Sequence, residues 1–148
     1  MLAPRDLARL AEIVRARCAG TPVEWTVELA PASVTDERLK IYATHFDHVD
    51  VNAGYHRILP REWVAGWMAQ TPDGFTFDFK LPKAFSESPE KSARDDGLVA
   101  EFLRSAEPIA EAGKLGAFFL IMPASFSPDR RKLDALADRL TKAERQLA

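Results

Sequence analysis

Three short segments of the chain alternate strictly between hydrophobic and polar residues. Residues 23–29, 48–52 and 75–80 each place apolar side chains on one face and polar side chains on the other. This two-residue period is typical of β-strands that are buried on one face only. Apolar residues recur at helical spacing between these segments, and Thr35 and Pro60 stand where two of the helices are expected to begin.

A continuous apolar run at residues 117–122 predicts a fourth strand, and this run is far too short to span a bilayer. A helix over about residues 97–112 precedes it, and a last helix is expected to open at Ser127-Pro128. Residues 81–96 are expected to form a polar loop. An amphipathic helix that begins at Pro4 comes before the first strand.

This order of elements predicts a single α/β domain, with an N-terminal helix in residues 1–20 and four strand-helix units in residues 21–148. Regular alternation of strands and helices is typical of a parallel sheet with right-handed crossovers. Central strands of an open doubly wound sheet are apolar on both faces, but here only the fourth strand is. The other three resemble barrel strands whose polar side faces a lumen. Since a closed barrel of this type needs eight units, we predict a half TIM-type barrel of four parallel strands.

Composition and charge narrow the class of protein. The chain has 148 residues, of which 28 % are charged and 47 % hydrophobic, and these values are ordinary for a globular protein. The single Cys18 cannot pair within the chain and the N-terminus does not resemble a signal peptide, so a cytoplasmic location with no membrane partner is expected. A net charge of −2 does not favour nucleic-acid binding, although it leaves a local basic patch possible.

The last polar residue of each strand is the most informative for function, because parallel-strand folds bind ligands at the carboxyl ends of their strands. These residues are Glu28, Asn52 and Lys80, with Asp50 one layer deeper. Carboxylates beside a lysine could serve as a general base or an ion-pair site. The alternative is a polar face whose charges pair with one another or with water.

The loop after the second strand adds an aromatic side chain and a guanidinium group, Tyr55 and Arg57, at the same end. Such groups can hold a phosphate or stack on a base, whereas the alternative is an ordinary connecting loop. The ligand-binding candidates are therefore Glu28, Asp50, Asn52, Tyr55, Arg57 and Lys80.

A metal site is suggested by three histidines with two neighbouring aspartates: His45, His48 and His56 with Asp47 and Asp50. Their positions at a helix end, a strand start and a loop would require a sharp reversal of the chain around the ion, so no metal site is predicted. The sequence also lacks the dinucleotide-binding, phosphate-loop and nucleophile-elbow motifs. No cofactor is predicted, and no reaction can be named.

Three stretches carry a resemblance to a known family: YATHFDHVDVN at 42–52, TPDGFTFDFK at 71–80 and PASFSPD at 123–129. Together with Arg57, Leu59-Pro60 and Trp67 between them, they resemble the domain of unknown function 72 family, the YecE-like proteins. The resemblance extends from about Leu39 to Leu140 and implies a TIM-type barrel. It brings no settled biochemical activity with it.

The sequence also differs from the family pattern. The usual Gly-Thr-Ser-Gly-Trp first strand is not matched, Asp50 stands for a Glu, and Ile121 stands for a Gln, whereas Asn52, Arg57 and Lys80 are kept. Two functions therefore remain open. The chain either binds a small anionic or phosphate-bearing ligand, or acts as a catalytically silent half-barrel in an assembly.

Assembly is suggested by the fourth predicted strand, because both of its faces are apolar. Phe118, Leu120 and Met122 lie on one face and Phe119 and Ile121 on the other, so one set would be exposed in a monomer. A half-barrel also leaves its first and last strands as unpaired edges. We therefore predict a homodimer with the fourth strand or its neighbouring edge at the interface.

Overall fold

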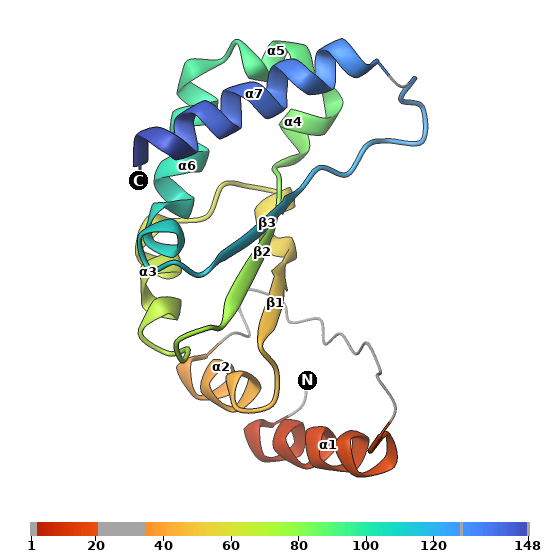
Figure 1. The fold of residues 1–148 in the computed structure, drawn as a ribbon, viewed down its shortest axis with the longest axis vertical. Helices are drawn as coiled ribbons and strands as arrows, with labels where there is room; N and C mark the ends of the chain where they lie inside the picture. The colour runs from red at the N-terminus through yellow and green to blue at the C-terminus, as the bar shows by residue number, and fades with distance from the viewer. Residues whose placement is uncertain (1–2, 21–34, 128, 148) are drawn as a thin grey trace.

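The computed structural model describes residues 3–20, 35–127 and 129–147 of the chain. The elements in chain order are α1 (Pro4–Arg17), α2 (Asp36–Ala43), β1 (His48–Val51), the 3-10 helix η2 (Asn52–Tyr55), α3 (Arg61–Met68), β2 (Thr76–Lys80), α4 (Lys83–Glu87), α5 (Pro89–Ala93), α6 (Asp96–Glu111), β3 (Leu115–Phe119) and α7 (Arg130–Leu147). Within these residues, three strands form a parallel sheet in the order β1-β2-β3 (Figure 1). The described part of the chain is therefore an α/β structure.

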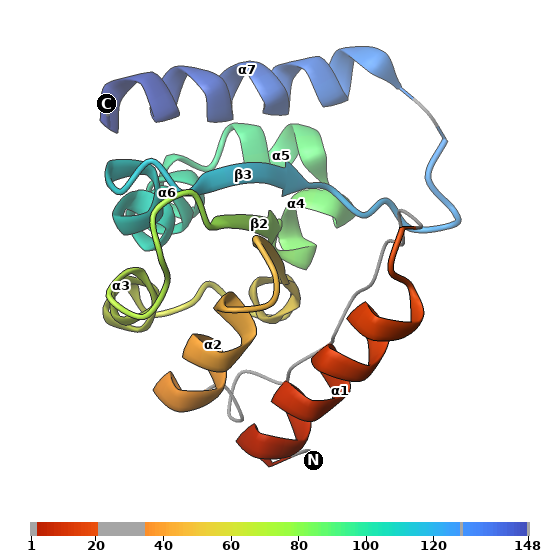
Figure 2. The same ribbon diagram turned by 60° about the horizontal axis from the view of Figure 1, so that its bottom comes forward.

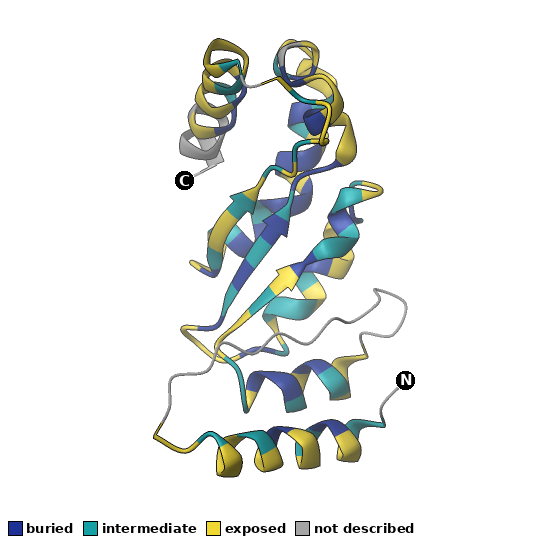
Figure 3. Ribbon diagram, turned by 90° about the vertical axis from the view of Figure 1, so that its right-hand side faces the viewer, coloured by how far each residue is buried: buried dark blue, intermediate teal, exposed yellow. Residues whose placement is uncertain are grey.

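Helices α3 and α6 pack against one face of this sheet. Figure 3 looks onto the opposite face, with α3 and α6 behind the strands, and that face is called the open face below. Helix α7 packs against α5 and α6, and α1 and α2 lie beyond the amino ends of the strands (Figures 1 and 2). No helix among the described residues combines the length and the apolar character that a membrane crossing requires.

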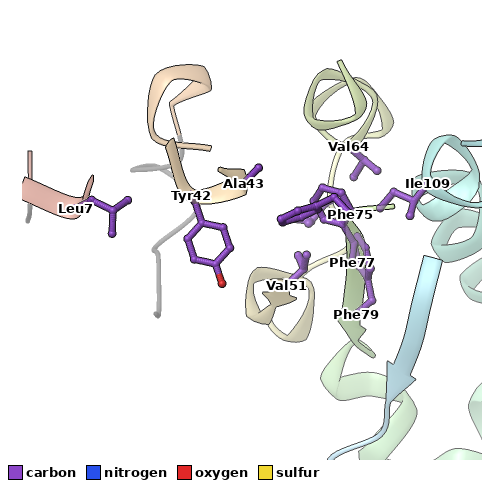
Figure 4. Packing of buried hydrophobic residues seen from close by; sticks show 10 residues of the cluster. Leu7, Tyr42, Ala43, Val51, Val64, Phe75, Phe77, Phe79 and Ile109 are labelled. Carbon is purple, nitrogen blue, oxygen red and sulfur yellow. The ribbon is translucent and has the colours of Figure 1, made fainter. Parts of the chain in front are cut away.

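Three phenylalanines, one directly before β2 and two within it, build the centre of the core. Phe75, Phe77 and Phe79 are each at most 2 % exposed, and Val64 of α3 and Ile109 of α6 meet them fully buried (Figure 4). The polar residues that alternate with them along β2 remain partly exposed. The prediction that the polar face of the strands points away from the helices is confirmed for β1 and β2.

The prediction of a polar loop at residues 81–96 is wrong, because this segment forms the short helices α4 and α5. Phe85 is fully buried and packs edge to face on Phe102 of α6, with ring centroids 5.7 Å apart. Ser92 Oγ donates a hydrogen bond of 2.8 Å to the Ala84 carbonyl and holds the two short helices together. The contacts of Phe85 and Ser92 therefore help to fix the two helices, although most residues of the segment are polar.

The predicted strand at 117–122 is shifted, since β3 spans Leu115–Phe119. A bulge interrupts its pairing: Phe77 lies opposite Leu115, whereas Phe79 lies opposite Phe118, so β3 holds one more residue than β2 in this stretch. Ala117 N donates a hydrogen bond of 2.6 Å to Asp78 Oδ1, which satisfies an amide of the bulge.

The remaining sequence predictions concern the first strand and the helix starts. Residues 23–29, and Glu28 with them, lie outside the described residues, so the four-strand count stays a prediction. Thr35 caps α2 as expected, because its side chain accepts a hydrogen bond of 3.3 Å from Arg38 N. The N-terminal helix α1 packs on α2 through Leu7 and Ala11.

Tyr42 is expected to make stability depend on pH in the alkaline range. Burial raises the pKa of Tyr42 from 10.0 to about 12, and the carboxylates of Asp50 and Asp47 add to the shift. Because the unfolded phenol loses its proton first, the contribution is complete below about pH 10 and is lost between pH 10 and 12.

The Tyr42→Phe variant tests this dependence. It loses the hydrogen bond of 3.0 Å to the His48 carbonyl, so at pH 7 it should unfold with about 1 kcal/mol less free energy than the wild type. In urea denaturation across the alkaline range, the difference between the two proteins should shrink above pH 10. A difference that stays constant up to pH 12 would contradict the assignment.

Candidate functional site

The carboxyl ends of the three strands lie together at the upper end of the sheet in Figure 1, where η2, α4 and the segment after β3 begin. Gly54 lets η2 lie close against the end of β2, because a Cβ atom at this position would be 2.9 Å from the Lys80 carbonyl oxygen. The close approach brings Asn52 and Tyr55 of η2 to the end of β2. Three predicted candidates therefore share one neighbourhood.

The predicted acidic residue lies on the open face, one layer below the strand ends. Asp50 is exposed on β1 and faces Asp78 of β2 in register, so two carboxylates are neighbours there. Asp78 is engaged with the Ala117 amide of the bulge. Lys80 follows on the same face and is partly buried. The open face thus presents carboxylates below and an ammonium group near the strand ends.

The other aromatic and basic candidates make contacts of their own. The guanidinium of Arg57 lies over the Trp63 ring of α3, 5.2 Å from its centroid. Tyr55 packs edge to face against His56, with centroids 5.2 Å apart. Arg57 is therefore engaged with α3, and the predicted set is only partly brought together.

A cleft of about 650 Å³ opens between the helices α4 and α5, which follow β2, and the connection from β3 to α7. Its basic side chains are Lys91, Arg94 and Lys132, and it has one acidic side chain, Glu87. Glu87 forms an ion pair of 2.9 Å with Lys83. The remaining lining residues are Ser86, Ser88, Pro89, Pro123, Ser125, Phe126 and Ser127. The lining combines positive charge, hydroxyl groups and a small apolar wall.

Local hydrogen bonds hold the two sides of this cleft. On one side, Ser86 is buried and its Oγ donates a bond of 2.8 Å to the Lys83 carbonyl. On the other side, Phe126 N donates a bond of 2.9 Å to the Pro123 carbonyl and closes a turn. Ammonium, guanidinium and hydroxyl groups on fixed segments are the donors that bind oxyanions such as phosphate.

A second hollow of about 570 Å³ adjoins the cleft and shares Arg94 and Lys132 with it. It lies between α5 and α7 and is lined also by Arg131 and Arg139. Its acidic side chains are Asp129 and Asp138. Lys132 Nζ lies 3.7 Å from Asp129 Oδ2, and Arg139 forms an ion pair with Asp96. Basic groups outnumber acidic ones in both hollows.

Sequence reasoning missed the cleft, because it treated Lys83 and the stretch from Glu87 to Asp96 as a solvated loop. The signal that could have found it is the PASFSPD stretch, which supplies Ser125, Phe126 and Ser127 to the opposite side. Within the part of the chain that the structure describes, His, Cys, Asp and Glu side chains form no group of three that could hold a metal ion.

Comparisons with known proteins agree on one family. A family model described as "Protein of unknown function DUF72" matches residues 21–148. The UPF0759 protein YecE of Escherichia coli, in strains K12 and O157:H7, is 39 % identical over 98 residues, which are 66 % of this chain and 34 % of that protein. The chain therefore spans about a third of the length of the curated relatives it matches.

Solved structures are similar in the same way. Two crystal structures of a DUF72 family protein from Enterococcus faecalis V583 superimpose with TM-scores of 0.58 and 0.59 at 29 % identity. Each match covers 68 % of this chain, and 41 % and 38 % of the respective solved chains.

Proposed function

We propose that this chain, which belongs to the DUF72 family, binds a small anionic, phosphate-bearing ligand in the cleft between α4, α5 and the connection from β3 to α7. The observation that carries the proposal is the cleft of about 650 Å³ in which three basic side chains and four serines meet only one acidic side chain. A volume of this size is in the range of small-molecule sites.

The charge balance of the cleft supports an anion in particular. Glu87 is drawn toward Lys83, outside the cleft, by their ion pair. Lys91 and Arg94 come from α5 and its end, whereas Lys132 comes from α7, so a bound anion would bridge two elements that are far apart in the sequence. Charge-assisted hydrogen bonds to such an anion are stronger than bonds between neutral groups.

A matched pair of lysine variants tests the location of the anion. Lys91→Met removes a cation from the cleft, and Lys80→Met removes the cation from the strand-end set on the open face. Titration calorimetry with inorganic phosphate at low salt should show about tenfold weaker binding for Lys91→Met, the loss expected for one charge-assisted contact. Lys80→Met should stay within about twofold of the wild type.

The opposite result would be equally informative. Weaker binding only in Lys80→Met would show that the anion does not bind in the cleft. The anion would then be assigned to the set with Asp50 and Asn52 that the sequence predicts. If the wild type takes up neither inorganic phosphate nor pyrophosphate, the proposed function is wrong. Circular dichroism of both variants checks that the fold is retained.

A second candidate function, assembly with another copy of this chain, is favoured by the end of β3. Phe119 and Ile121 are each 44 % exposed, and in the described sheet β1 and β3 each have one unpaired edge. A two-fold axis along the strands would place the β3 edge of each copy beside the opposite edge of its partner, with all strands parallel. If residues 23–29 form a strand next to β1, two half-barrels of four strands supply the eight that close a barrel.

This assembly is tested by light scattering at high micromolar concentration. The wild type should be a dimer, and Ile121→Asp should be a folded monomer, because a carboxylate cannot be buried without a partner. Ile13→Asp, which replaces a similarly exposed residue on α1, is the control and should remain a dimer. A wild-type monomer at this concentration would exclude the assembly.

A further inference from the structure

We propose that the ligand of the cleft is a nucleotide that carries more than one phosphate group, an inference that rests on the proposed function. Two features of the described residues go beyond what a simple inorganic anion needs. The first is an apolar wall with an aromatic ring in the cleft itself. The second is the adjoining basic hollow between α5 and α7.

The aromatic wall is formed by Phe126, which remains partly exposed while it lines the cleft. The turn closed by the bond from Phe126 N to the Pro123 carbonyl fixes its backbone, and Pro89 and Pro123 add apolar surface to the same cleft. An aromatic face beside cationic groups is the arrangement on which nucleobases stack, and this stacking tolerates different bases. A bare phosphate would leave this wall unused.

The adjoining hollow offers a place for further phosphate groups. Arg94 and Lys132 line both hollows, so a ligand that contacts them in the first can continue into the second without a break. Arg131 lines only the second hollow. Four basic side chains line this hollow. The acidic groups beside them are Asp129, which pairs with Lys132, Asp138, and Asp96, which pairs with Arg139, so successive phosphates would still meet a net positive charge.

The charge of the whole chain favours a single nucleotide over a nucleic-acid strand. The net charge of −2 provides no general attraction for a polyanion, which non-specific nucleic-acid binding requires. Five basic side chains line two hollows of about 650 and 570 Å³, and each hollow has the size of a small-molecule site.

Titration calorimetry of the full chain tests the inference with inorganic triphosphate, AMP, ATP and a single-stranded oligonucleotide. ATP should bind about tenfold more tightly than inorganic triphosphate, because only ATP can stack. Phe126→Leu should remove this advantage and Phe126→Tyr should keep it. Arg131→Gln should weaken the binding of ATP about tenfold and leave the binding of AMP unchanged. The control Lys40→Gln, at an exposed position of α2, should change neither affinity.

The outcomes separate this inference from the proposed function. Equal affinities for inorganic triphosphate and ATP, or no loss of ATP affinity in Phe126→Leu, would show that the ligand is not a nucleotide. The proposed anion site would remain valid. Equal binding of AMP and ATP, or no effect of Arg131→Gln, would show that the hollow between α5 and α7 holds no further phosphate group. Tighter binding of the oligonucleotide than of ATP would show that the ligand is a nucleic-acid strand and not a single nucleotide. No binding of any phosphate-bearing probe would refute both proposals.

Discussion

The Lys114→Met variant is expected to lose about 3 kcal/mol of its free energy of unfolding, because it leaves several buried oxygens without a donor. Lys114 is 6 % exposed, and its Nζ donates to the carbonyl of Thr71 at 2.7 Å, the hydroxyl of Thr71 at 3.1 Å and the carbonyl of Met68 at 3.2 Å. An ammonium group has three donors, and all three are used here. Methionine keeps the volume and provides none.

Lys114 lies where several elements meet, so the loss of its hydrogen bonds weakens the packing between these elements. It follows Gly113, whose φ of 65° ends α6, and its own carbonyl accepts a bond of 2.8 Å from Phe77 N of β2. The side chain therefore joins the end of α3 to the point where α6 gives way to β3.

Urea denaturation measures the effect, with Lys40→Met as the matched control. Lys40 is exposed, so the same substitution there should change the free energy of unfolding by less than about 0.5 kcal/mol. A loss below about 1 kcal/mol at Lys114 would show that water replaces the ammonium at these oxygens.

The Gly116→Ala variant is expected to lose about 2 kcal/mol, because the new methyl group would overlap the Asp78 carboxylate. Relief requires Asp78 to turn away and give up its hydrogen bond of 2.6 Å with Ala117 N. The bulge in β3 would then lose the side chain that holds it. The effect is therefore due to a pair of residues and not to the glycine backbone alone.

A double-mutant cycle with Asp78→Ala isolates this pair. In the Asp78→Ala background the overlap is gone, so the additional cost of Gly116→Ala should fall below about 0.5 kcal/mol. The coupling between the two substitutions is then more than about 1 kcal/mol. Additive losses in urea denaturation would instead place the cost of the methyl group elsewhere in the bulge.

Elements with a local sequence signal could be predicted closely. The helix expected at about 97–112 is α6 at Asp96–Glu111, and the alternation of residues 75–80 correctly assigned Phe75, Phe77 and Phe79 to the core. Both signals depend on the periodic direction of side chains along one element, so they are independent of what the element packs against.

Elements without a period could not be placed in the same way. The run at 117–122 is apolar at every position, so nothing local marks where β3 ends. Pairing with β2 decided that boundary, and the contact of Asp78 with Ala117 accompanies the extra residue. The short helices α4 and α5 likewise depend on the burial of Phe85 against α6.

The same distinction between local signals and tertiary packing applies to the candidate site. The sequence by itself determined that the polar residues of β1 and β2 share one face and that Asn52 and Lys80 come at strand ends, because alternation and chain direction are local properties. Only the tertiary structure decided the cleft, whose walls come from residues 86–94 and 123–132. No periodicity connects segments so far apart in the chain. Their meeting depends on the packing of α5 and α7 around a shared core.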